Sequence, residues 1–167
     1  YEISECLVGS EMCIRDRETT EQLTDELLSE DENKYHAFLI LDVDCFKQIN
    51  DIYGHAVGDI VLQKFGKLLK GTFREGDILG RIGGNEFGVI MKNIQTKDIA
   101  MKKAEELLAK TQAYKIDELK GNNISISIGI STAPQDGDCY MDLYKRADQA
   151  LYQAKRSGKA RVCNYFS

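Results

Sequence analysis

The 167 residues of this chain are enough for one domain with a buried core. Apolar residues make up 43% of the chain and charged residues 29%, which is typical of a globular protein. The net charge of −5 argues against a nucleic-acid polymer as the partner, although a local basic patch is still able to bind phosphate groups. The five cysteines show no C-x-x-C spacing and do not predict a zinc site.

The first residues differ in pattern from the rest of the chain. Residues 1–16 show no hydrophobic periodicity, and we interpret them as a segment outside the domain: a linker, a tag or a sequence artefact. A leading helix and linker are predicted over 17–34, with the helix from Glu18 to Ser29, and the domain itself over 35–167. No apolar run reaches the length of a membrane span and no signal peptide is evident, which predicts a cytoplasmic domain; a membrane anchor would belong to another part of the full-length protein.

The apolar run 37–41 predicts a strand that is buried on both faces, and it leads into Asp42-Val43-Asp44. Carboxylates at the end of a buried strand are costly to desolvate unless a cation meets them. Asp44 has a second interpretation as the cap of a helical turn over 45–48, which leaves Asp42 unexplained.

A loop with strong turn chemistry follows over 50–55, and Gly58-Asp59 is predicted to open a long helix. Residues 74–77 form a turn into the central stretch 81–87, Arg-Ile-Gly-Gly-Asn-Glu-Phe, which lies between two apolar runs and predicts a β-hairpin. Its glycines allow positive φ and the close approach of a ligand, with Asn85 and Glu86 next to them. A hairpin without a function fits the same pattern.

The remaining pattern predicts a helix over 97–110, a strand over 124–130, a helix over 140–156 and a last strand over 161–165. The strand 124–130 alternates, with isoleucines on one face and mostly small residues on the other. The stripe of apolar residues on the final helix, which includes Tyr140 and Tyr144, is interpreted as core. The order of elements predicts an α+β fold, a mostly antiparallel sheet with helices on its faces and a ferredoxin-like βααββαβ core.

A carboxylate cluster emerges from this arrangement. Asp42 and Asp44 end a buried strand, Glu86 lies on the hairpin, and Lys47 and Lys155 lie near element ends. Carboxylates without histidine or cysteine favour Mg²⁺, which is often bound together with nucleotide phosphates. The residues alone therefore suggest a metal-assisted nucleotide site.

Four segments resemble the GGDEF domain, the catalytic module of diguanylate cyclases, in order and at the family's spacing. They are 41–55 with Gly58-Asp59, 81–87, 127–130 and 147–155. The resemblance implies a nucleotidyl-cyclase-like fold and a reaction that joins two GTP molecules into cyclic di-GMP with release of pyrophosphate. It also implies a homodimer with one GTP in each domain, a cofactor of Mg²⁺ or Mn²⁺, and a sensor or receiver domain upstream.

Site residues are carried over by position. The resemblance implies metal ligation by the Asp42 carboxylate, the Val43 carbonyl and Glu86, and catalytic roles for Glu86, Lys47 and the position of Asn85. It implies guanine recognition by Asn50 and Asp59, and triphosphate binding by Cys45, Phe46, Lys47, Lys155 and Lys159.

The chain departs from the family pattern in three places. The third signature letter is an acid in active members but Asn85 here, so the signature is the degenerate GGNEF. An amide oxygen brings no charge and cannot accept a proton as a carboxylate does. Lys159 replaces the usual arginine of the phosphate-binding tail and lacks its bidentate fork. The D-x-L-T-G-L-x-N-R motif is missing, with Arg17 near the position of its last residue, which suggests that residues 1–16 displace native sequence.

Arg74 and Asp77 match the family's inhibitory R-x-x-D motif, which binds cyclic di-GMP; a solvated turn pair is the alternative interpretation.

Three functions stay open at this point. The first is a diguanylate cyclase weakened by Asn85, the second a catalytically inactive module that binds GTP or cyclic di-GMP, and the third a dimerising scaffold without a nucleotide. The retained substrate residues argue against the scaffold.

Overall fold

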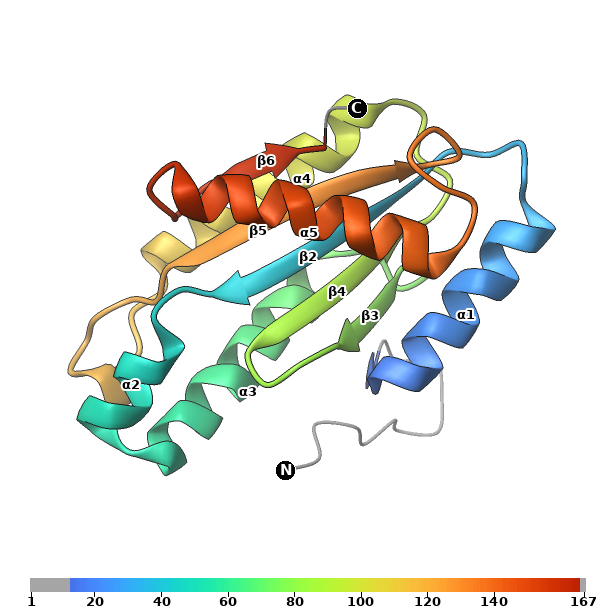
Figure 1. The fold of residues 1–167 in the computed structure, drawn as a ribbon. Helices are drawn as coiled ribbons and strands as arrows, with labels where there is room; N and C mark the ends of the chain where they lie inside the picture. Colours follow the sequence, from blue (N-terminus) through green and yellow to red (C-terminus); the bar gives the residue numbers. More distant parts are fainter. Residues whose placement is uncertain (1–12, 166–167) are drawn as a thin grey trace.

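A six-stranded sheet with the order β1-β3-β4-β2-β5-β6 forms the centre of the computed structural model, which describes residues 13–165 (Figure 1). The strands are β1 (Ile14–Arg15), β2 (His36–Val43), β3 (Ile78–Arg81), β4 (Glu86–Met91), β5 (Ile126–Ala133) and β6 (Val162–Asn164). The four central strands pair antiparallel, and the edge strands β1 and β6 run parallel to their neighbours. The predicted α+β class with a mostly antiparallel sheet is confirmed.

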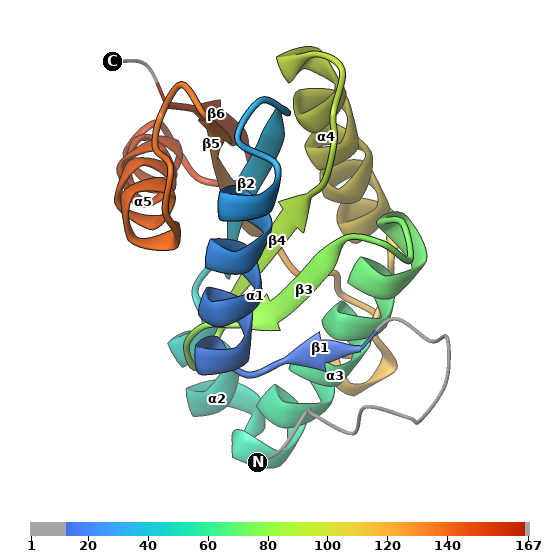
Figure 2. The ribbon, with the colours of Figure 1, turned by 90° about the vertical axis from the view of Figure 1, so that its right-hand side faces the viewer.

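Helices cover both faces of this sheet (Figure 2). The helices α1 (Arg17–Glu30) and α5 (Tyr140–Arg156) cover one face, and α3 (His55–Thr72) and α4 (Lys97–Ala113) cover the other (Figure 2). The short helix α2 (Phe46–Tyr53) lies beyond the end of β2 (Figure 1), and a short 3₁₀ turn occurs at Asp117–Leu119. Alternate residues of β2 point to opposite sides, so that Leu39 and Leu41 pack with α3 and α4 while Phe38 and Ile40 pack with α5. Two hydrophobic clusters, one on each face, therefore hold the sheet between the helices.

The alternation predicted for β5 is present. Ile126, Ile128 and Ile130 lie in the cluster under α3 and α4. Gly129 lies against α5 so closely that a Cβ there would be 2.1 Å from the carbonyl oxygen of Ala147. The small residues of β5 thus let α5 pack directly onto the strand.

Several boundaries differ from the predicted ones. The long helix α3 begins at His55, not at Gly58, because Gly54 with φ of +91° both ends α2 and precedes α3. Strand β5 begins at Ile126 and runs on to Ala133. The turn residues at 50–55, which predict a loop, are therefore absorbed into two helices joined by one glycine.

The N-terminal end of the described chain contributes to the sheet. Ile14 is buried and pairs with Leu79, and the Asp16 side chain accepts a hydrogen bond from the Thr19 backbone N–H at 2.7 Å, which caps α1. Most of the predicted non-family segment, residues 1–12, lies outside the described residues. The domain boundary at residue 16 stays a prediction. None of the described helices is long and apolar enough to cross a membrane.

Candidate functional site

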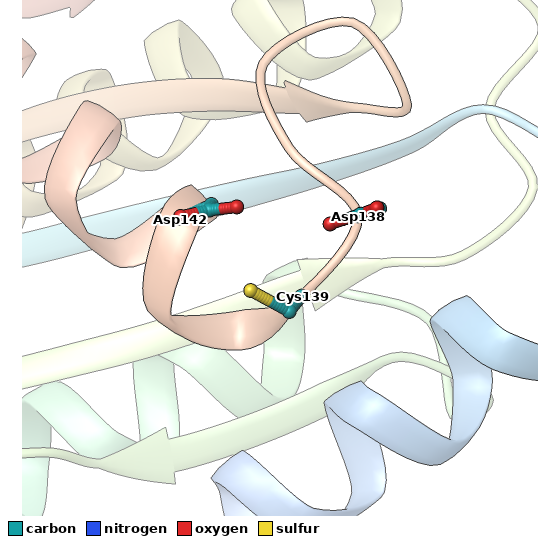
Figure 3. Close-up of side chains that lie close together, drawn as sticks. All are labelled: Asp138, Cys139 and Asp142. Carbon is teal, nitrogen blue, oxygen red and sulfur yellow. The ribbon is translucent and has the colours of Figure 1, made fainter.

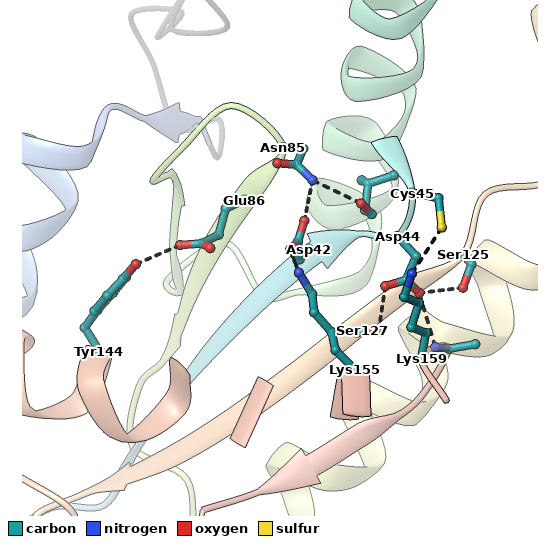
Figure 4. A network of polar contacts seen from close by, with 12 residues as sticks. Asp42, Asp44, Cys45, Asn85, Glu86, Ser125, Ser127, Tyr144, Lys155 and Lys159 are labelled. Carbon is teal, nitrogen blue, oxygen red and sulfur yellow. Dashed lines mark hydrogen bonds and ion pairs between the residues drawn. The ribbon is translucent and has the colours of Figure 1, made fainter. Parts of the chain in front are cut away.

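The ends of β2 and β4 bring the predicted acidic residues together (Figure 4). Asp42 lies directly opposite Glu86 across the antiparallel pair, and both side chains are on the face that α5 covers. Lys155, in the last turn of α5, forms an ion pair with Asp42. The sheet register and the α5 contact therefore assemble three of the predicted site residues.

The Asp42 carboxylate has a partner at each oxygen. Asn85 Nδ2 donates to Asp42 Oδ1, and Lys155 Nζ donates to Oδ2. Asn85 Nδ2 also donates to the Val43 carbonyl oxygen at 3.0 Å. A carboxylate and a carbonyl oxygen are acceptors only, so the amide has to present its NH₂ group and not its oxygen to them.

Glu86 accepts a hydrogen bond from Tyr144 and not from Asn85 or Lys155. The Tyr144 hydroxyl donates to Glu86 Oε1 at 3.1 Å, and the Arg17 guanidinium lies 5.8 Å from the centre of the Tyr144 ring. Burial raises the pKa of Glu86, and the Tyr144 hydrogen bond opposes this shift. Burial also raises the pKa of Tyr144 to about 12, so the phenol keeps its proton and remains a donor at neutral pH.

The pKa of Asp42 is raised as well. Its cause is first burial, which penalises the charged form, while the Lys155 ammonium works in the opposite direction. The nearby carboxylates of Asp44 and Asp148 add to the rise. The end of β2 is therefore a partly dry site in which a carboxylate depends on its cationic partner.

Asp44 does not cap α2. Its carboxylate accepts hydrogen bonds from Ser125 Oγ at 2.6 Å, from Ser127 Oγ at 2.7 Å and from the Ala160 backbone N–H at 3.2 Å. The N-cap of α2 is Cys45, with φ of 55° and no capping side-chain bond. Asp44 thus ties the end of β2 to β5 and to the loop after α5.

The start of α2 carries the residues predicted to hold phosphate. Cys45 and Lys47 are exposed there, and Phe46 is half-buried. Lys159 Nζ reaches across from the loop after α5 to donate to Cys45 Sγ at 3.2 Å. The first N–H groups of a helix have no partner within the helix, so this end of α2 offers N–H donors as well as lysines.

The two residues predicted to bind guanine lie on adjacent helices, Asn50 on α2 and Asp59 on α3. Asn50 packs against Gly58, where a Cβ would be 1.9 Å from Asn50 Oδ1, and Asp59 is the next residue. Asn50 Oδ1 is buried and has no hydrogen-bond partner. A buried amide oxygen without a partner is costly in a folded protein, and this makes the pair a candidate for ligand contact.

The comparisons with known proteins decide the family. The family described as "Diguanylate cyclase, GGDEF domain" matches residues 14–161. The chain belongs to the GGDEF family. It is 40% identical to Diguanylate cyclase A of Treponema denticola over 127 residues, which are 75% of this chain and 34% of that protein. The chain thus spans about a third of the length of this curated relative.

Solved GGDEF domains have the same fold. The GGDEF domain of TpbB from Pseudomonas aeruginosa superposes with a TM-score of 0.87, at 31% identity, over 92% of this chain and 98% of that one. The active GGEEF domain of a diguanylate cyclase from Vibrio cholerae gives 0.86, at 29% identity, over 92% of this chain and 99% of that one. The third signature letter of the Vibrio domain is an acid, where this chain has Asn85.

The GGDEF family is generally dependent on divalent metals, but the side chains at this site do not fit one. Of the three predicted ligands, Asp42 and Val43 already accept hydrogen bonds from Asn85, and Glu86 accepts one from Tyr144. Mg²⁺ requires a shell of oxygen ligands, whereas Asn85 presents an NH₂ group. The acid that would supply a charged oxygen at the third signature position is replaced by Asn85.

Arg81, at the end of β3, holds the loop of the signature hairpin through hydrogen bonds. Arg81 Nε donates to the Gly84 carbonyl oxygen at 3.1 Å, and its Nη2 donates to the same oxygen at 2.6 Å. Positive φ among the glycines of residues 13–165 occurs at Gly54, Gly121 and Gly158, so Gly83 and Gly84 do not depend on it. A Cβ at Gly84 would meet no atom within 4 Å. The chain's own packing therefore does not require this glycine.

The predicted inhibitory pair forms a closed turn. The Asp77 side chain is 1% exposed and accepts from the Arg74 backbone N–H at 3.1 Å, from Arg74 Nη2 at 3.2 Å and from the Lys92 N–H at 3.1 Å. Arg74 also donates to the Lys92 carbonyl oxygen, while its side chain stays 59% exposed. Asp77 therefore fixes the turn, and Arg74 is the member that faces solvent.

A second group of possible metal ligands, Asp138, Cys139 and Asp142, lies at the start of α5 (Figure 3). It is at the opposite end of α5 from Lys155 and shares no residue with the site at Asp42. Acidic residues at a helix N-terminus are favoured by the helix dipole alone, so this group needs no ligand to explain it.

Sequence reasoning missed Tyr144 and the two serines that hold Asp44. Tyr144 lies within the apolar stripe of α5, which the sequence pattern predicts to be core. The signal that points to it is chemical: Tyr144 is half-buried, and a tyrosine in an apolar stripe still carries a hydroxyl that can donate to a carboxylate.

Proposed function

We propose that this GGDEF domain binds GTP at the end of β2 and condenses two GTP molecules into cyclic di-GMP only weakly. The observation that carries the proposal is the contact of Asn85 with Asp42 and Val43. The substrate residues are kept, but the position that is acidic in the active Vibrio domain donates hydrogen bonds into the predicted metal ligands.

Guanine binding is supported by the Asn50–Asp59 pair. Asn50 Oδ1 is buried without a partner, and an amide together with a carboxylate suits the donors and acceptors of guanine. The Asp59 carboxylate would accept from N1–H and from the exocyclic amine. This role calls for selectivity for guanine over adenine, with GTP bound in preference to ATP.

Phosphate binding is supported by charge at the start of α2. Lys47, Lys155 and Lys159 would meet the triphosphate, with backbone N–H groups from Cys45 to Lys47. The open space at Gly84 leaves the hairpin backbone accessible to a ligand.

In the family's reaction the 3′-hydroxyl oxygen of each GTP forms a bond to the α-phosphorus of the other. Each attack breaks the bond between the α-phosphorus and the bridging oxygen, so that two pyrophosphates leave and the two hydroxyl protons pass to solvent. The two GTP molecules sit in facing domains, so we expect a homodimer, brought together by an upstream sensor or receiver domain. Divalent cations stabilise the developing phosphate charge in such reactions. Asn85 supplies no charge there, and the loss of one carboxylate is expected to cost about 3–5 kcal/mol of transition-state stabilisation, roughly two to four decades in rate.

The test is cyclic di-GMP production from GTP with Mg²⁺ or Mn²⁺, by wild type and by Asn85→Asp, in a dimeric form of the protein. We expect little product from wild type and a gain of roughly two to four decades for the variant. Asn123→Asp, an exposed position with the same change of charge, is the control and should stay at the wild-type rate. Wild-type turnover equal to that of Asn85→Asp would refute the role given to Asn85.

The second candidate function is a catalytically inactive regulatory module that binds GTP or cyclic di-GMP. The exposed Arg74, held by Asp77, supports a cyclic di-GMP site, because a guanidinium binds phosphate and the Hoogsteen edge of guanine. Titration with cyclic di-GMP should show binding by wild type and its loss in Arg74→Ala. Equal binding by both proteins would rule out this site.

A further inference from the structure

Asn85 occupies the place of a metal ligand but has the opposite hydrogen-bonding polarity. Its NH₂ group points at Asp42 Oδ1 and at the Val43 carbonyl oxygen, the two atoms that the family pattern gives to a cation. We infer that this site binds GTP without a divalent cation, because Asn85 and Lys155 take the cation's place at Asp42. The inference rests on the proposed GTP binding.

The charges support this assignment. Asp42 carries one negative charge, and the Lys155 ammonium, in direct contact, carries one positive charge. An acid at position 85 would add a second negative charge beside Asp42, and a bound cation would then be needed to hold the carboxylates together. The neutral amide of Asn85 removes that need and adds two hydrogen bonds.

The other carboxylates near Asp42 have hydrogen-bond partners of their own or act on it through charge. Glu86 accepts from Tyr144, and Asp44 accepts from two serine hydroxyls and one backbone N–H. Asp148 acts on Asp42 and Glu86 only through its charge. Lys47, Lys159 and the N-terminus of α2 remain as the positive groups for the phosphates.

Asn85→Asp reverses the hydrogen-bonding polarity at this position. The carboxylate that this substitution introduces cannot donate to Asp42 Oδ1 or to the Val43 carbonyl oxygen, so three acceptors would face one another. The variant is therefore expected to recover a site that a divalent cation has to fill before the triphosphate binds well. Asn123→Asp makes the same change of charge at an exposed position and is the matched control.

Isothermal titration with 3′-deoxy-GTP, which lacks the attacking hydroxyl, separates binding from turnover. For wild type and Asn123→Asp, affinity in EDTA and in excess Mg²⁺ should agree within about threefold. For Asn85→Asp, Mg²⁺ should tighten binding by roughly tenfold or more over EDTA. The inference is overturned if wild type also loses about tenfold or more in EDTA, or if Asn85→Asp shows no gain from Mg²⁺.

A second measurement needs no nucleotide. Electron paramagnetic resonance of added Mn²⁺ should show one more tight site in Asn85→Asp than in wild type, with any Mn²⁺ at Asp138, Cys139 and Asp142 common to both. Equal Mn²⁺ binding by the two proteins also overturns the inference. If 3′-deoxy-GTP binds neither protein under either condition, the proposed GTP site itself is wrong, and the metal-free site falls with it.

Discussion

The hydroxyl of Tyr144 is the group that sets the position of Glu86. It donates to the ionised carboxylate at 3.1 Å, and this bond opposes the rise in pKa that burial causes. Tyr144→Phe removes the bond to the charged form and nothing else, so the pKa of Glu86 should rise further. A titration of the Glu86 carboxyl carbon by NMR measures this shift.

Tyr152→Phe is the control for this prediction, because Tyr152 is an exposed tyrosine on the same helix. The Glu86 titration should be the same in that variant as in wild type. An unchanged Glu86 titration in Tyr144→Phe would show that the hydrogen bond does not determine its ionisation. The stability cost of the lost hydrogen bond is expected to be about 1 kcal/mol.

At the residue scale, the sequence predicts which acids gather but not what they contact. Asp42 and Glu86 are predictable because a carboxylate after a buried apolar run, and one beside a glycine pair, are unusual placements. The direction of the Asn85 amide was not predictable, because it depends on two acceptors that lie 42 and 43 residues away along the chain. The spacing of a motif predicts where its residues lie along the chain, whereas the direction in which the Asn85 amide donates depends on the folded site around it.

At the scale of elements, the close packing of α5 on β5 depends on Gly129. A Cβ there would be 2.1 Å from the Ala147 carbonyl oxygen and 2.4 Å from the Leu151 nitrogen, and both are backbone atoms that cannot move without the helix. Gly129→Ala should therefore destabilise the domain by about 3 kcal/mol or more, or prevent folding. Urea denaturation followed by circular dichroism measures the change.

Gly71→Ala is the matched variant. Gly71 lies near the end of α3, and a Cβ there would meet no atom within 4 Å. Alanine has the higher helix propensity, so this variant should be more stable by about 0.5–1 kcal/mol. If Gly129→Ala lowers the free energy of unfolding and Gly71→Ala raises it, the loss at Gly129 comes from the clash with α5 and not from replacing glycine as such.

Elements were predictable where periodicity is strong and less so where turn chemistry dominates. The bounds of α5 agree with its apolar stripe, and β5 has the predicted alternation. The start of α3 was predicted three residues late, because Gly54 and His55 look like loop residues in sequence. One glycine at φ of +91° is enough to redirect the chain between two helices, and no longer loop is needed.

At the scale of the molecule, the two clusters on either side of the sheet follow from the binary pattern of the strands. Strands β2 and β5 are both buried along their whole length. The apolar run of β2 predicts this central position, whereas β5 alternates isoleucines with small residues that lie under α5. The edge strands are harder to predict from the sequence. Strand β1 has two residues and lies in the segment that the sequence pattern places outside the domain. An edge strand this short carries too little pattern to be detected from sequence.

The two ends of β2 differ in chemistry. Asp42 is near one end, at the site, and His36 is at the other, fully buried, with Nδ1 accepting from the Asn93 backbone N–H at 3.1 Å. Burial lowers the pKa of His36, and the charges of Lys34 and Lys92 add to this, while the Asp31 carbonyl and carboxylate oppose it. The folded domain therefore keeps His36 neutral at a pH at which the unfolded chain binds a proton.

The sign of the effect on stability follows from this difference. The contribution of His36 is fully present above the unfolded pKa of about 6.5 and is lost as the pH falls from there toward the lower pKa of the folded state. His36→Asn keeps an acceptor for the Asn93 N–H and removes the titrating group. Between pH 7.5 and 5, wild type should lose about 1 kcal/mol more of its unfolding free energy than His36→Asn does, as measured by urea denaturation. His55→Asn, at an exposed histidine, should keep the wild-type slope; an unchanged slope in His36→Asn would mean that other groups cause the acid sensitivity.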